Sequence, residues 1–579
     1  MTSVAPDVVR VLCDAKGPDK AFDYGVPPEL AERARVGSIV RVDLHGRRLR
    51  GWIVDVDPPE RTNVDRLLPL RAVSGMGPDA HLVELAAWAA HRWAGRSSHF
   101  LAVASPPRVI LRLGDARRSG LRPEPRSPAT TELLAAGGGT LRLPPGTDQL
   151  PVVWSAVALG TTLVVVPGLE QVAILASRLR RAGVSVAVLP DEWAAAAAGV
   201  DVVIGTRTAA FARVDALAAV VVLDEHDERL QSEASPTWHA REVALERGAR
   251  LGVPVVLVSP VPSVEAMHER SFRAPGVERE RRGWPRVEVV DLDTEDPRRR
   301  GLVSGRLIEE LRDHSRRVVC VVNTVGRSRL LACSACRSLA RCELCDGICG
   351  SEVDGGLTCR RCGTDRPAVC AACGASAFRN LRPGVSRLRE EMEAAAGRPV
   401  IDIESARHDV GATIDADAVV GTEAALHRVG HADTVVICDL DDELLAARYT
   451  APARTAALVA LAARRVGRAE AGGLLILQTR MPDHRAVTAL ASLDLDGWSA
   501  IESSQRGVLG LPPFGSLAVV EGPGADDFIT SLGHPDVVIG GGDGRWQVRA
   551  RDAATLSAAL ASGVRVPGRR LRIAVDPVR

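Results

Sequence analysis

Lysine is almost absent from this sequence of 579 residues. Of its 73 basic residues only two are lysines, Lys16 and Lys20, and the other 71 are arginines. The excess of arginine mostly indicates a GC-rich coding bias. Its functional consequence is that no site beyond residue 20 can contain a lysine, the side chain with which phosphate-binding loops contact the phosphates of a nucleotide.

Other features are missing as well. No run of about 18 continuous apolar residues is present, so no transmembrane helix is expected. The first residues lack a basic segment followed by an apolar one, which predicts no signal peptide and a cytoplasmic protein. Aromatic residues make up 3% of the chain, so its cores must consist of Val, Leu and Ala. The net charge of +1 gives no support for a strongly basic nucleic-acid-binding protein, although local patches could still matter.

What is present indicates several domains, because 579 residues are too many for one core. Up to residue 105 short β-like runs alternate with turns. "SIVRVDL" (38–44) and "RGWIVDV" (50–56) flank the basic segment "HGRRLR", which predicts a hairpin with an arginine-rich tip. Apolar residues at helical spacing predict a helix over 81–95, and Pro, Arg, Gly and Ser dominate 106–150, which predicts a linker.

Two series of apolar runs follow, and helix-compatible segments separate their members. Continuous apolar strands that alternate with helices are typical of a parallel sheet covered on both faces. The sequence therefore predicts two similar α/β lobes in tandem. The expected strands are 161–167, 184–190, 200–206, 219–225 and 253–259 in the first lobe, and 316–323, 399–404, 416–422, 433–442 and 472–479 in the second.

A dense cysteine cluster interrupts the second lobe. Eight of the twelve cysteines form four C-x-x-C pairs within residues 333–373. In a chain without a secretion signal such pairs indicate metal rather than disulfides, and two pairs make one tetrahedral thiolate site. We therefore expect two structural Zn²⁺ ions per chain, with no open position for catalysis. The four pairs are Cys333/Cys336, Cys342/Cys345, Cys359/Cys362 and Cys370/Cys373.

Two pairings of these cysteines are possible. The nested arrangement assigns Cys333, Cys336, Cys370 and Cys373 to the first zinc and Cys342, Cys345, Cys359 and Cys362 to the second. The sequential arrangement would close one site across the five residues between the first two pairs, which is tight, so the nested one is preferred. Cys349 is a spare cysteine without an assigned role, and Cys13, Cys320 and Cys438 lie in apolar runs typical of a core.

One apolar run ends in two acids, as "AVVVLDE" places Asp224 and Glu225 at the end of an expected buried strand. That is where nucleotide-hydrolysing domains deliver carboxylates to Mg²⁺ and water. The phosphate-binding loop should then precede the first helix of the lobe, around 142–162. That segment contains no lysine and no G-x-x-x-x-G-K-[ST] motif. We therefore predict a degenerate nucleotide site and expect neither ATP nor Mg²⁺ as a cofactor.

The arrangement of motifs resembles the primosomal protein N′ (PriA) family of replication-restart helicases over nearly the whole chain. "KAFDYGVPPEL" and "VGSIVRVDL" resemble the N-terminal DNA-binding domain of that family, "IGTRTAAFA" its G-T-R-S-A-L-F motif and "LDEHDE" its D-E-E-H motif. The cysteine pairs match its two-zinc insert, "VVGTEAAL" resembles its G-T-Q-M motif, and "LGLPPFGSLAVV" is similar to the start of its C-terminal domain.

The resemblance implies a multidomain α/β fold with two RecA-like helicase lobes and small β-rich domains at both ends. It gives 1–105 as a 3′-end DNA-binding domain, 106–150 as a linker without the winged helix of the family, and 151–275 as a degenerate first lobe. It gives 276–332 and 376–500 as the second lobe, 333–375 as the zinc insert and 501–579 as the C-terminal domain.

The chain departs from the family in its helicase motifs. Besides the missing loop, G-S-A-T-P appears as "VSPVPS", L-N-R-R-G-Y as "VNTVGRS", and the arginine-finger motif as "LAARRVGRAE", which keeps Arg465 and Arg468. This pattern resembles the helicase-degenerate form found in actinobacteria. Because an arginine finger stabilises a transferring phosphoryl group, we expect Arg465 and Arg468 to contact DNA phosphates or the other lobe instead.

The family's N-terminal domain holds the 3′ end of a DNA strand. Carried over by motif, this gives Phe22, Asp23 and Tyr24 of "FDY", Gly37 of "VGS" and Arg71 of "LRAV" as DNA-binding residues. An aromatic face can stack a terminal base, and a carboxylate with backbone N–H groups can bind the 3′ hydroxyl. Alternatively, Phe22 and Tyr24 pack in the core and Asp23 caps a turn. Arg47, Arg48 and Arg50 would contact phosphates, or would form only a solvated turn.

The resemblance implies a replication restart protein that binds forked or single-stranded DNA. It would help to assemble the primosome and to reload the replicative helicase, with that helicase, its loader and single-stranded DNA-binding protein as partners, and without membrane contact. We expect no catalytic residue and no helicase activity. One alternative is an active ATP-dependent 3′–5′ DNA helicase, and the other is a scaffold that only recruits proteins.

Overall fold

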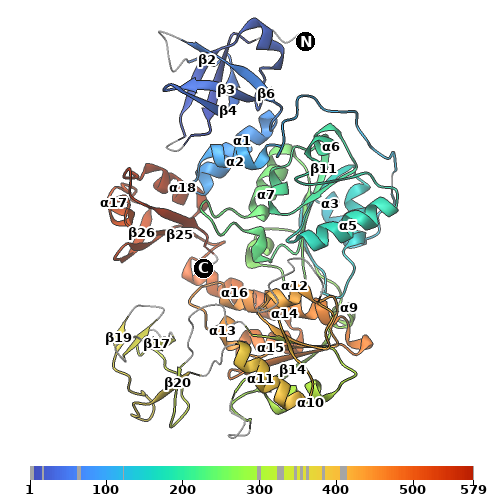
Figure 1. Ribbon diagram of the computed structural model, residues 1–579, viewed down its shortest axis with the longest axis vertical. Helices are drawn as coiled ribbons and strands as arrows, with labels where there is room; N and C mark the ends of the chain where they lie inside the picture. The colour runs from blue at the N-terminus through green and yellow to red at the C-terminus, as the bar shows by residue number, and fades with distance from the viewer. Residues whose placement is uncertain are drawn as a thin grey trace. The chain divides into compact units, whose positions relative to one another are not determined.

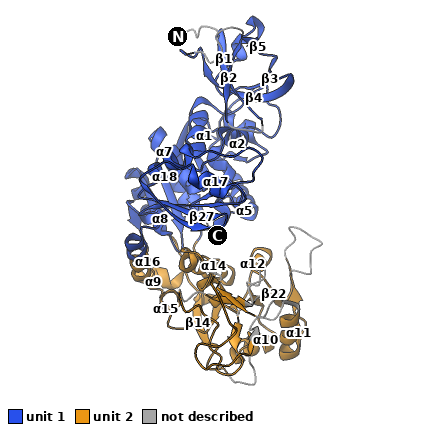
Figure 2. Cartoon of the chain, turned by 90° about the vertical axis from the view of Figure 1, so that its left-hand side faces the viewer, with its two compact units in different colours: residues 1–142, 148–274, 503–578 blue, residues 143–147, 275–502, 579 orange. Residues whose placement is uncertain are grey.

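The computed structural model divides the chain into two compact units (Figure 2). It describes residues 6–15, 19–60, 67–121, 123–295, 301–322, 331–344, 348–351, 356–359, 364–380, 385–403 and 414–577. The first unit comprises residues 1–142, 148–274 and 503–578, and the second comprises 143–147 and 275–502. The N-terminal domain, the first lobe and the C-terminal domain therefore form one unit, and the second lobe with its insert forms the other.

The N-terminal domain is a six-stranded sheet that curls until its edges meet (Figure 1). Its order is β5-β2-β1-β4-β3-β6, yet β5 and β6 are neighbours in sequence. Leu70 donates its N–H to Gly25 on one side, and Arg71 donates to Arg41 on the other. The elements are β1 (Val8–Cys13), β2 (Ala21–Gly25), the 3₁₀ helix η1 (Pro28–Arg33), β3 (Ile39–Leu44), β4 (Arg47–Val56), β5 (Leu68–Pro69) and β6 (Ala72–Gly75).

The expected hairpin joins β3 and β4. His45 and Gly46 form its two-residue turn with φ angles of 49° and 72°, the positive values that a type I′ turn requires. The expected helix is α1 (Ala80–Arg92), whose N-cap Asp79 accepts a hydrogen bond from the Leu82 N–H at 3.0 Å. Together with α2 (Ser97–Ala104), it packs in one apolar cluster with residues of the first lobe.

The first lobe is a parallel sheet of order β13-β7-β12-β11-β8-β10-β9. All five strands expected from the apolar runs are present, and their residues are almost fully buried. The elements are α3 (Pro128–Ala135), β7 (Gly138–Arg142), α4 (Leu150–Val157), β8 (Thr161–Val165), α5 (Leu169–Arg181), β9 (Val186–Val188), α6 (Trp193–Ala198), β10 (Val202–Gly205), η2 (Arg207–Phe211), β11 (Leu217–Leu223), η3 (Glu228–Leu230), α7 (Ala240–Leu251), β12 (Val255–Ser259), α8 (Val264–Met267) and β13 (Phe272–Arg273).

The segment expected to be an irregular linker is shorter than 106–150. Its second half contains α3 and β7, and β7 lies inside the sheet between β12 and β13. The strand starts with Gly138 and Gly139, and a Cβ on Gly138 would lie 2.5 Å from the Val255 carbonyl oxygen. The tight packing of β7 therefore requires glycine, and the two glycines break the apolar pattern by which the other strands were predicted.

The second lobe is also a parallel sheet, of order β14-β24-β23-β15-β22-β21. The five expected strands are present, and β14 adds an edge strand that the pattern did not predict. The elements are α9 (Val277–Arg282), β14 (Arg286–Asp291), α10 (Gly305–Arg312), β15 (Val318–Val321), α11 (Val385–Ala396), β21 (Ile401–Asp402), β22 (Ala418–Gly421), α12 (Ala424–Arg428), β23 (Thr434–Ile437), α13 (Asp441–Leu444), α14 (Ala451–Val466), η5 (Ala469–Ala471), β24 (Leu474–Thr479), α15 (Arg485–Ser492) and α16 (Leu495–Leu509).

The insert and the C-terminal domain complete the fold, and the prediction of a multidomain α/β chain with two parallel sheets is confirmed. Between β15 and α11 lie five short strands, β16 (Leu331–Cys333), β17 (Cys349–Ser351), β18 (Leu357–Cys359), β19 (Asp365–Arg366) and β20 (Phe378–Asn380). The C-terminal domain is an antiparallel sheet of order β26-β27-β25-β28, formed by β25 (Ser516–Glu521), α17 (Ala525–Thr530), β26 (Val537–Gly542), β27 (Arg545–Ala550), α18 (Ala553–Ser562) and β28 (Arg572–Val575). Within the described ranges, no helix is both long and apolar enough to cross a membrane.

Candidate functional sites

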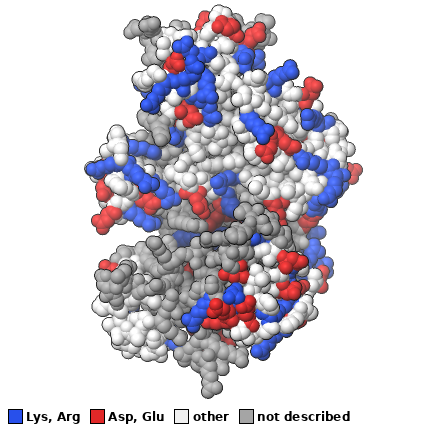
Figure 3. All heavy atoms as spheres, in the orientation of Figure 1, with Lys and Arg blue, Asp and Glu red and all other residues white. Residues whose placement is uncertain are grey.

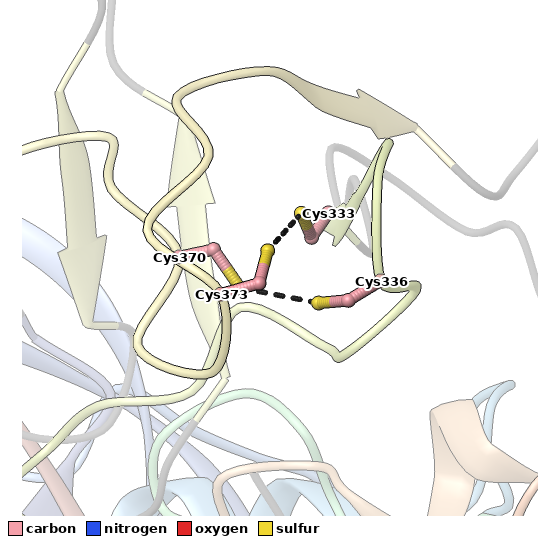
Figure 4. Close-up of side chains that lie close together, drawn as sticks. All are labelled: Cys333, Cys336, Cys370 and Cys373. Atoms are coloured by element: carbon pink, nitrogen blue, oxygen red, sulfur yellow. Dashed lines mark hydrogen bonds between the residues drawn. The ribbon is translucent and has the colours of Figure 1, made fainter.

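Four cysteines of the insert point toward one another (Figure 4). The Sγ atoms of Cys333, Cys336, Cys370 and Cys373 all lie within 4.8 Å of each other. Cys333 and Cys373 are 3.5 Å apart at sulfur, and so are Cys336 and Cys370. This is the grouping that the nested arrangement expects from cysteines up to 40 residues apart in sequence.

The two halves of this cluster are built alike. The residue after each second cysteine, Arg337 or Gly374, has a positive φ, of 70° and 74° respectively. Its N–H donates to the carbonyl of the first cysteine of its pair, at 3.0 Å for Cys333 and 2.9 Å for Cys370. The N–H of each first cysteine in turn donates to a carbonyl five residues onward. Each C-x-x-C segment is therefore a closed turn that directs two sulfurs to the same side.

The donor set fits zinc. Zn–S bonds of about 2.3 Å in a tetrahedral site place the sulfurs about 3.8 Å apart, close to the separations between Cys333 and Cys373 and between Cys336 and Cys370. The pKa of Cys336 is lowered to about 6, first because the Ser338 hydroxyl lies 3.4 Å from its sulfur, and also through the Ser338 backbone and the neighbouring thiols. A thiolate at neutral pH is the form that binds metal. The cluster could therefore hold one zinc ion.

Two of the four cysteines assigned to the second zinc are described. Cys342 and Cys359 are buried, at 5% and 1% exposure, in a small apolar cluster of the insert. The N–H of Cys359 donates to the carbonyl of Thr364, five residues onward, as in the first cluster. Cys345 and Cys362 lie outside the described residues. Cys349, the spare cysteine, is opposite Cys359 across the strand pair β17–β18 and is fully buried.

The two carboxylates predicted at the nucleotide site lie where expected, directly after β11. Both are buried, Asp224 at 2% and Glu225 at 0% exposure. Asp224 accepts hydrogen bonds from the side-chain amides of Gln149 at 3.0 Å and Gln171 at 2.9 Å, one on each oxygen. Its backbone has a φ of 52°. Both oxygens of Asp224 therefore already have protein donors.

Glu225 is bound even more completely. One oxygen accepts the Ser263 N–H at 2.8 Å, and the other accepts Arg241 Nη1 at 2.9 Å and the Ser263 hydroxyl at 2.8 Å. Burial disfavours the charge on Arg241, but Glu242, Glu225 and Glu265 together outweigh burial and raise its pKa. Glu225 thus forms a buried ion pair at the N-cap of α8, and Mg²⁺ would have to displace Arg241 or Ser263 to reach it.

The loop before α4, where a phosphate-binding loop was expected, offers little to a phosphate. Its Gly146 donates its N–H to the Gly283 carbonyl at 2.9 Å, and the Gly146 carbonyl accepts two bonds from Arg468, both at 3.2 Å. The next residues add a negative charge, since Asp148 forms a bidentate ion pair with Arg178 at 2.7 Å. The pKa of Asp148 is lowered, first by that hydrogen bond.

Sequence reasoning located Asp224, Glu225 and Arg468 but missed their partners. The Arg468 side chain donates to the Gly146 carbonyl within the second unit. Arg465 is half-buried in the last turn of α14, where its carbonyl accepts the Ala432 N–H at 3.1 Å. Ser263 belongs to "VSPVPS", which stands where the family has G-S-A-T-P.

The residues that the family resemblance assigns to the 3′-end site lie in three separate surroundings. Tyr24 is a core residue whose hydroxyl donates to the Asp43 carbonyl at 3.2 Å, and Arg71 binds the Asp43 carboxylate at 2.6 Å. Asp23 points to the other face, where it accepts two bonds from Arg10 at 2.9 and 3.3 Å. Phe22 is half-buried, with Lys20 Nζ 5.4 Å from its ring centre.

Gly37 lies apart from these contacts. Its N–H donates to Ile53 at 2.7 Å, its φ is +84°, and a Cβ would lie 1.6 Å from the Pro78 carbonyl oxygen. Close packing therefore explains this glycine, and its N–H already has an acceptor. Asp43, which sequence reasoning missed, joins Tyr24 to Arg71. The only sequence feature that could have indicated Asp43 is its place after Val42 on β3, because strand alternation puts it on the face opposite the core.

Comparisons with known proteins agree with the motifs. Residues 10–106 match a family model described as the 3′ DNA-binding domain of PriA. The chain is 28% identical to the probable replication restart protein PriA of Mycobacterium tuberculosis, over 87% of this chain and 85% of that one. It is 31% identical to the replication restart protein PriA of Treponema pallidum, over 54% of this chain and 50% of that one.

Among solved structures, a DEAD box protein from Methanococcus jannaschii aligns with a TM-score of 0.30 and 9% identity, over 62% of this chain and 86% of that one. The resemblance that the motifs indicated is confirmed by the family model and by the sequence matches. The chain is similar to PriA replication restart proteins over most of its length, and its residues 10–106 match the 3′ DNA-binding domain of that family.

Proposed function

We propose that this protein is a replication restart factor that binds stalled or branched replication forks without unwinding them by nucleotide hydrolysis. It acts in the cytoplasm, holds the 3′ end of a strand with its N-terminal domain, and helps to assemble the primosome and to reload the replicative helicase. Two structural zinc ions stabilise its insert. The match of residues 10–106 to a 3′ DNA-binding domain supports the DNA part of this proposal.

The observation that carries the proposal is that both oxygens of the buried Glu225 already accept hydrogen bonds, three in all, from Arg241 and Ser263. A carboxylate that serves Mg²⁺ or a water molecule must keep a lone pair free for it. Glu225 instead uses both oxygens for Arg241 and Ser263 in a site closed to solvent. Removing it from these partners would leave the buried Arg241 with only one of its two carboxylate partners, Glu242, so occupation by a metal ion would be opposed.

The DNA part of the proposal centres on Arg71. It is half exposed, at 53% for its side chain, and is held beside Asp43 at the place where the edges of the sheet meet. Its guanidinium can bind a phosphate next to a strand end while Asp43 keeps it oriented. Tyr24 supports this place through its hydrogen bond to the Asp43 carbonyl rather than by touching DNA itself, whereas Asp23 lies on the other face in its ion pair with Arg10.

The test combines hydrolysis with binding. Zinc-loaded full-length protein is assayed for ATP hydrolysis with and without forked DNA, and for binding to forks whose 3′ end is free or blocked by a phosphate. We expect no hydrolysis above background and about tenfold tighter binding to the free end, which corresponds to about 1.4 kcal/mol. Arg71→Ala should reduce that preference, whereas the exposed Arg35→Ala should leave it unchanged.

Two results would contradict the proposal. Hydrolysis that disappears in the Asp224→Asn, Glu225→Gln double variant would reveal a working nucleotide site and an active motor. Equal binding of free and blocked ends would instead favour the scaffold that only recruits proteins. The direct partner test is capture of purified replicative helicase or single-stranded DNA-binding protein, with and without fork DNA.

A further inference from the structure

One face of the hairpin β3–β4 carries arginines in a row. Alternation along the strands sends Val40 and Val42 into the core of the N-terminal domain and sends Arg41, Arg48 and Arg50 to the opposite face. Arg41 lies directly opposite Arg50, and Arg48 lies opposite Asp43. We call Arg41, Arg48 and Arg50 the arginine face. Figure 3 shows basic side chains gathered over this end of the domain.

The positive charge of this face is only partly compensated. Arg48 is 3.9 Å from the Asp43 carboxylate, which already binds Arg71, and Arg50 is 3.4 Å from Asp14. Among the described residues, Arg41 has no side-chain hydrogen bond or ion pair. Like charges directly opposite each other destabilise a strand pair, as Arg41 and Arg50 do here. An anion bound across the two strands would remove that repulsion.

At the Arg50 end the arginine face packs on a buried tryptophan, and at the hairpin turn it has free space around it. The Arg50 guanidinium lies 4.6 Å from the ring centre of Trp52, which is fully buried and donates its indole N–H to Ser105 at 2.9 Å. At the other end, a Cβ added to Gly46 would meet nothing within 4 Å. A long molecule can therefore lie along the hairpin without meeting another part of the domain at its tip.

The chemistry of the face favours a polyanion over a protein. Stable protein interfaces contain buried apolar or aromatic anchors. The large apolar side chains of residues 39–50 are all buried or half-buried, so the face offers no such anchor. Arginine guanidinium groups match the geometry of phosphate oxygens, to which they bind in pairs of hydrogen bonds.

We infer that the arginine face binds the sugar-phosphate backbone of DNA, an inference that rests on the proposed function and adds the surface that contacts the strand away from its 3′ end. Arg48 and Arg50 are two residues apart on one strand, which corresponds to about 6.8 Å. One strand of B-DNA rises about 3.4 Å per phosphate along its axis, so a hairpin that lies parallel to this axis places the two arginines about two phosphate steps apart. Arg41 reaches the same backbone from β3.

The experiment measures how DNA binding depends on salt. The affinity for forked DNA is determined between about 50 and 200 mM salt for the wild type and for the Arg41→Ala, Arg48→Ala double variant, which keeps Arg50 and Arg71. Each phosphate contact contributes about 0.7 to 0.9 to the slope of log K against log salt. We therefore expect the double variant to reduce the slope by about 1.4 to 1.8 and to weaken binding equally on free and blocked 3′ ends.

Two controls separate position from charge. Arg35→Ala with Arg551→Ala removes two exposed arginines outside the arginine face and should leave the slope unchanged. Arg41→Lys with Arg48→Lys keeps both charges and should restore most of the slope. Thermal unfolding of each variant verifies the fold. The inference is overturned if the alanine variant keeps the wild-type slope, or if the control pair reduces it as much.

Failure of the inference and failure of the proposed function give different results. If the wild type prefers a free 3′ end but the double variant keeps the slope, the proposed function stands and the arginine face is wrong. If the wild type binds free and blocked ends equally while the slope still falls in the double variant, the arginine face stands and fork recognition through the 3′ end is wrong. If the wild type does not bind DNA, both are wrong.

Discussion

The cysteine cluster and the acidic pair after β11 are both sets of metal-binding side chains, yet only the cluster has donor atoms to spare. The sulfurs of Cys333 and Cys370 face other sulfurs at distances that suit a shared zinc ion. The oxygens of Asp224 and Glu225 face amide, guanidinium and hydroxyl donors of the protein itself. The residue types at a site therefore indicate less than the partners to which their donor atoms are already bound.

The largest effect is expected from breaking the cluster. Because structural zinc sites contribute about 10–16 kcal/mol of apparent binding free energy, Cys333→Ser with Cys370→Ser should release one zinc ion per chain and unfold the outer part of the insert. Elemental analysis of the purified protein and hydrogen exchange over 331–380 measure this. The matched control is Cys320→Ala, a buried core cysteine, which should keep the full zinc content. An unchanged zinc content in the double serine variant would contradict the site.

The next effect concerns Glu225, and it would show that this residue of the expected degenerate nucleotide site stabilises the fold. Glu225→Ala removes one of the two carboxylates that pair with the buried Arg241 and leaves Glu242, so it should cost about 3 kcal/mol of folding free energy, the lower end of the range for a broken buried ion pair. Glu225→Gln should cost less, because its amide oxygen can still accept from Ser263. Denaturation followed by tryptophan fluorescence measures both. A variant with unchanged stability would mean that Glu225 is free for another role.

Glu225 also shows which features of the protein the sequence could predict and which it could not. The strands of both lobes could be predicted because each is a continuous apolar run, and β7 could not because Gly138 and Gly139 replace the apolar residues that would reveal it. The outer cysteine grouping followed from spacing alone. The hydrogen-bond partners of Glu225 could not be predicted. Arg241 and Ser263 lie 16 and 38 residues away in sequence, and only the packing of α7 and α8 brings them to Glu225.

A smaller effect is expected at Asp224, where the two Gln amides bind. Asp224→Asn keeps the positive φ, which asparagine tolerates, but turns one oxygen into a donor that faces another donor. This should cost about 1–3 kcal/mol, the usual penalty for a buried polar group that loses its partner. Asp224→Ala loses both bonds and adds backbone strain, so it should be the more unstable of the two. The reverse order in urea denaturation would contradict this account of the site.

The smallest effect concerns Asp148, the carboxylate that stands where a phosphate-binding loop would need a cation. Its pKa is lowered by Arg178, so the pair stabilises the fold above the usual aspartate pKa of about 4 and loses that contribution as pH falls through the lowered value. Both side chains are nearly half exposed, so Arg178→Ala should cost no more than about 1 kcal/mol at pH 7 and less in acid. Arg181→Ala, on the same helix and bonded only to Ser177, is the control for urea midpoints at both pH values. A cost at pH 7 as large as that of Glu225→Ala would show that this exposed pair supports the lobe as strongly as the buried one does. The contrast between free and occupied donor atoms would then extend to the loop as well.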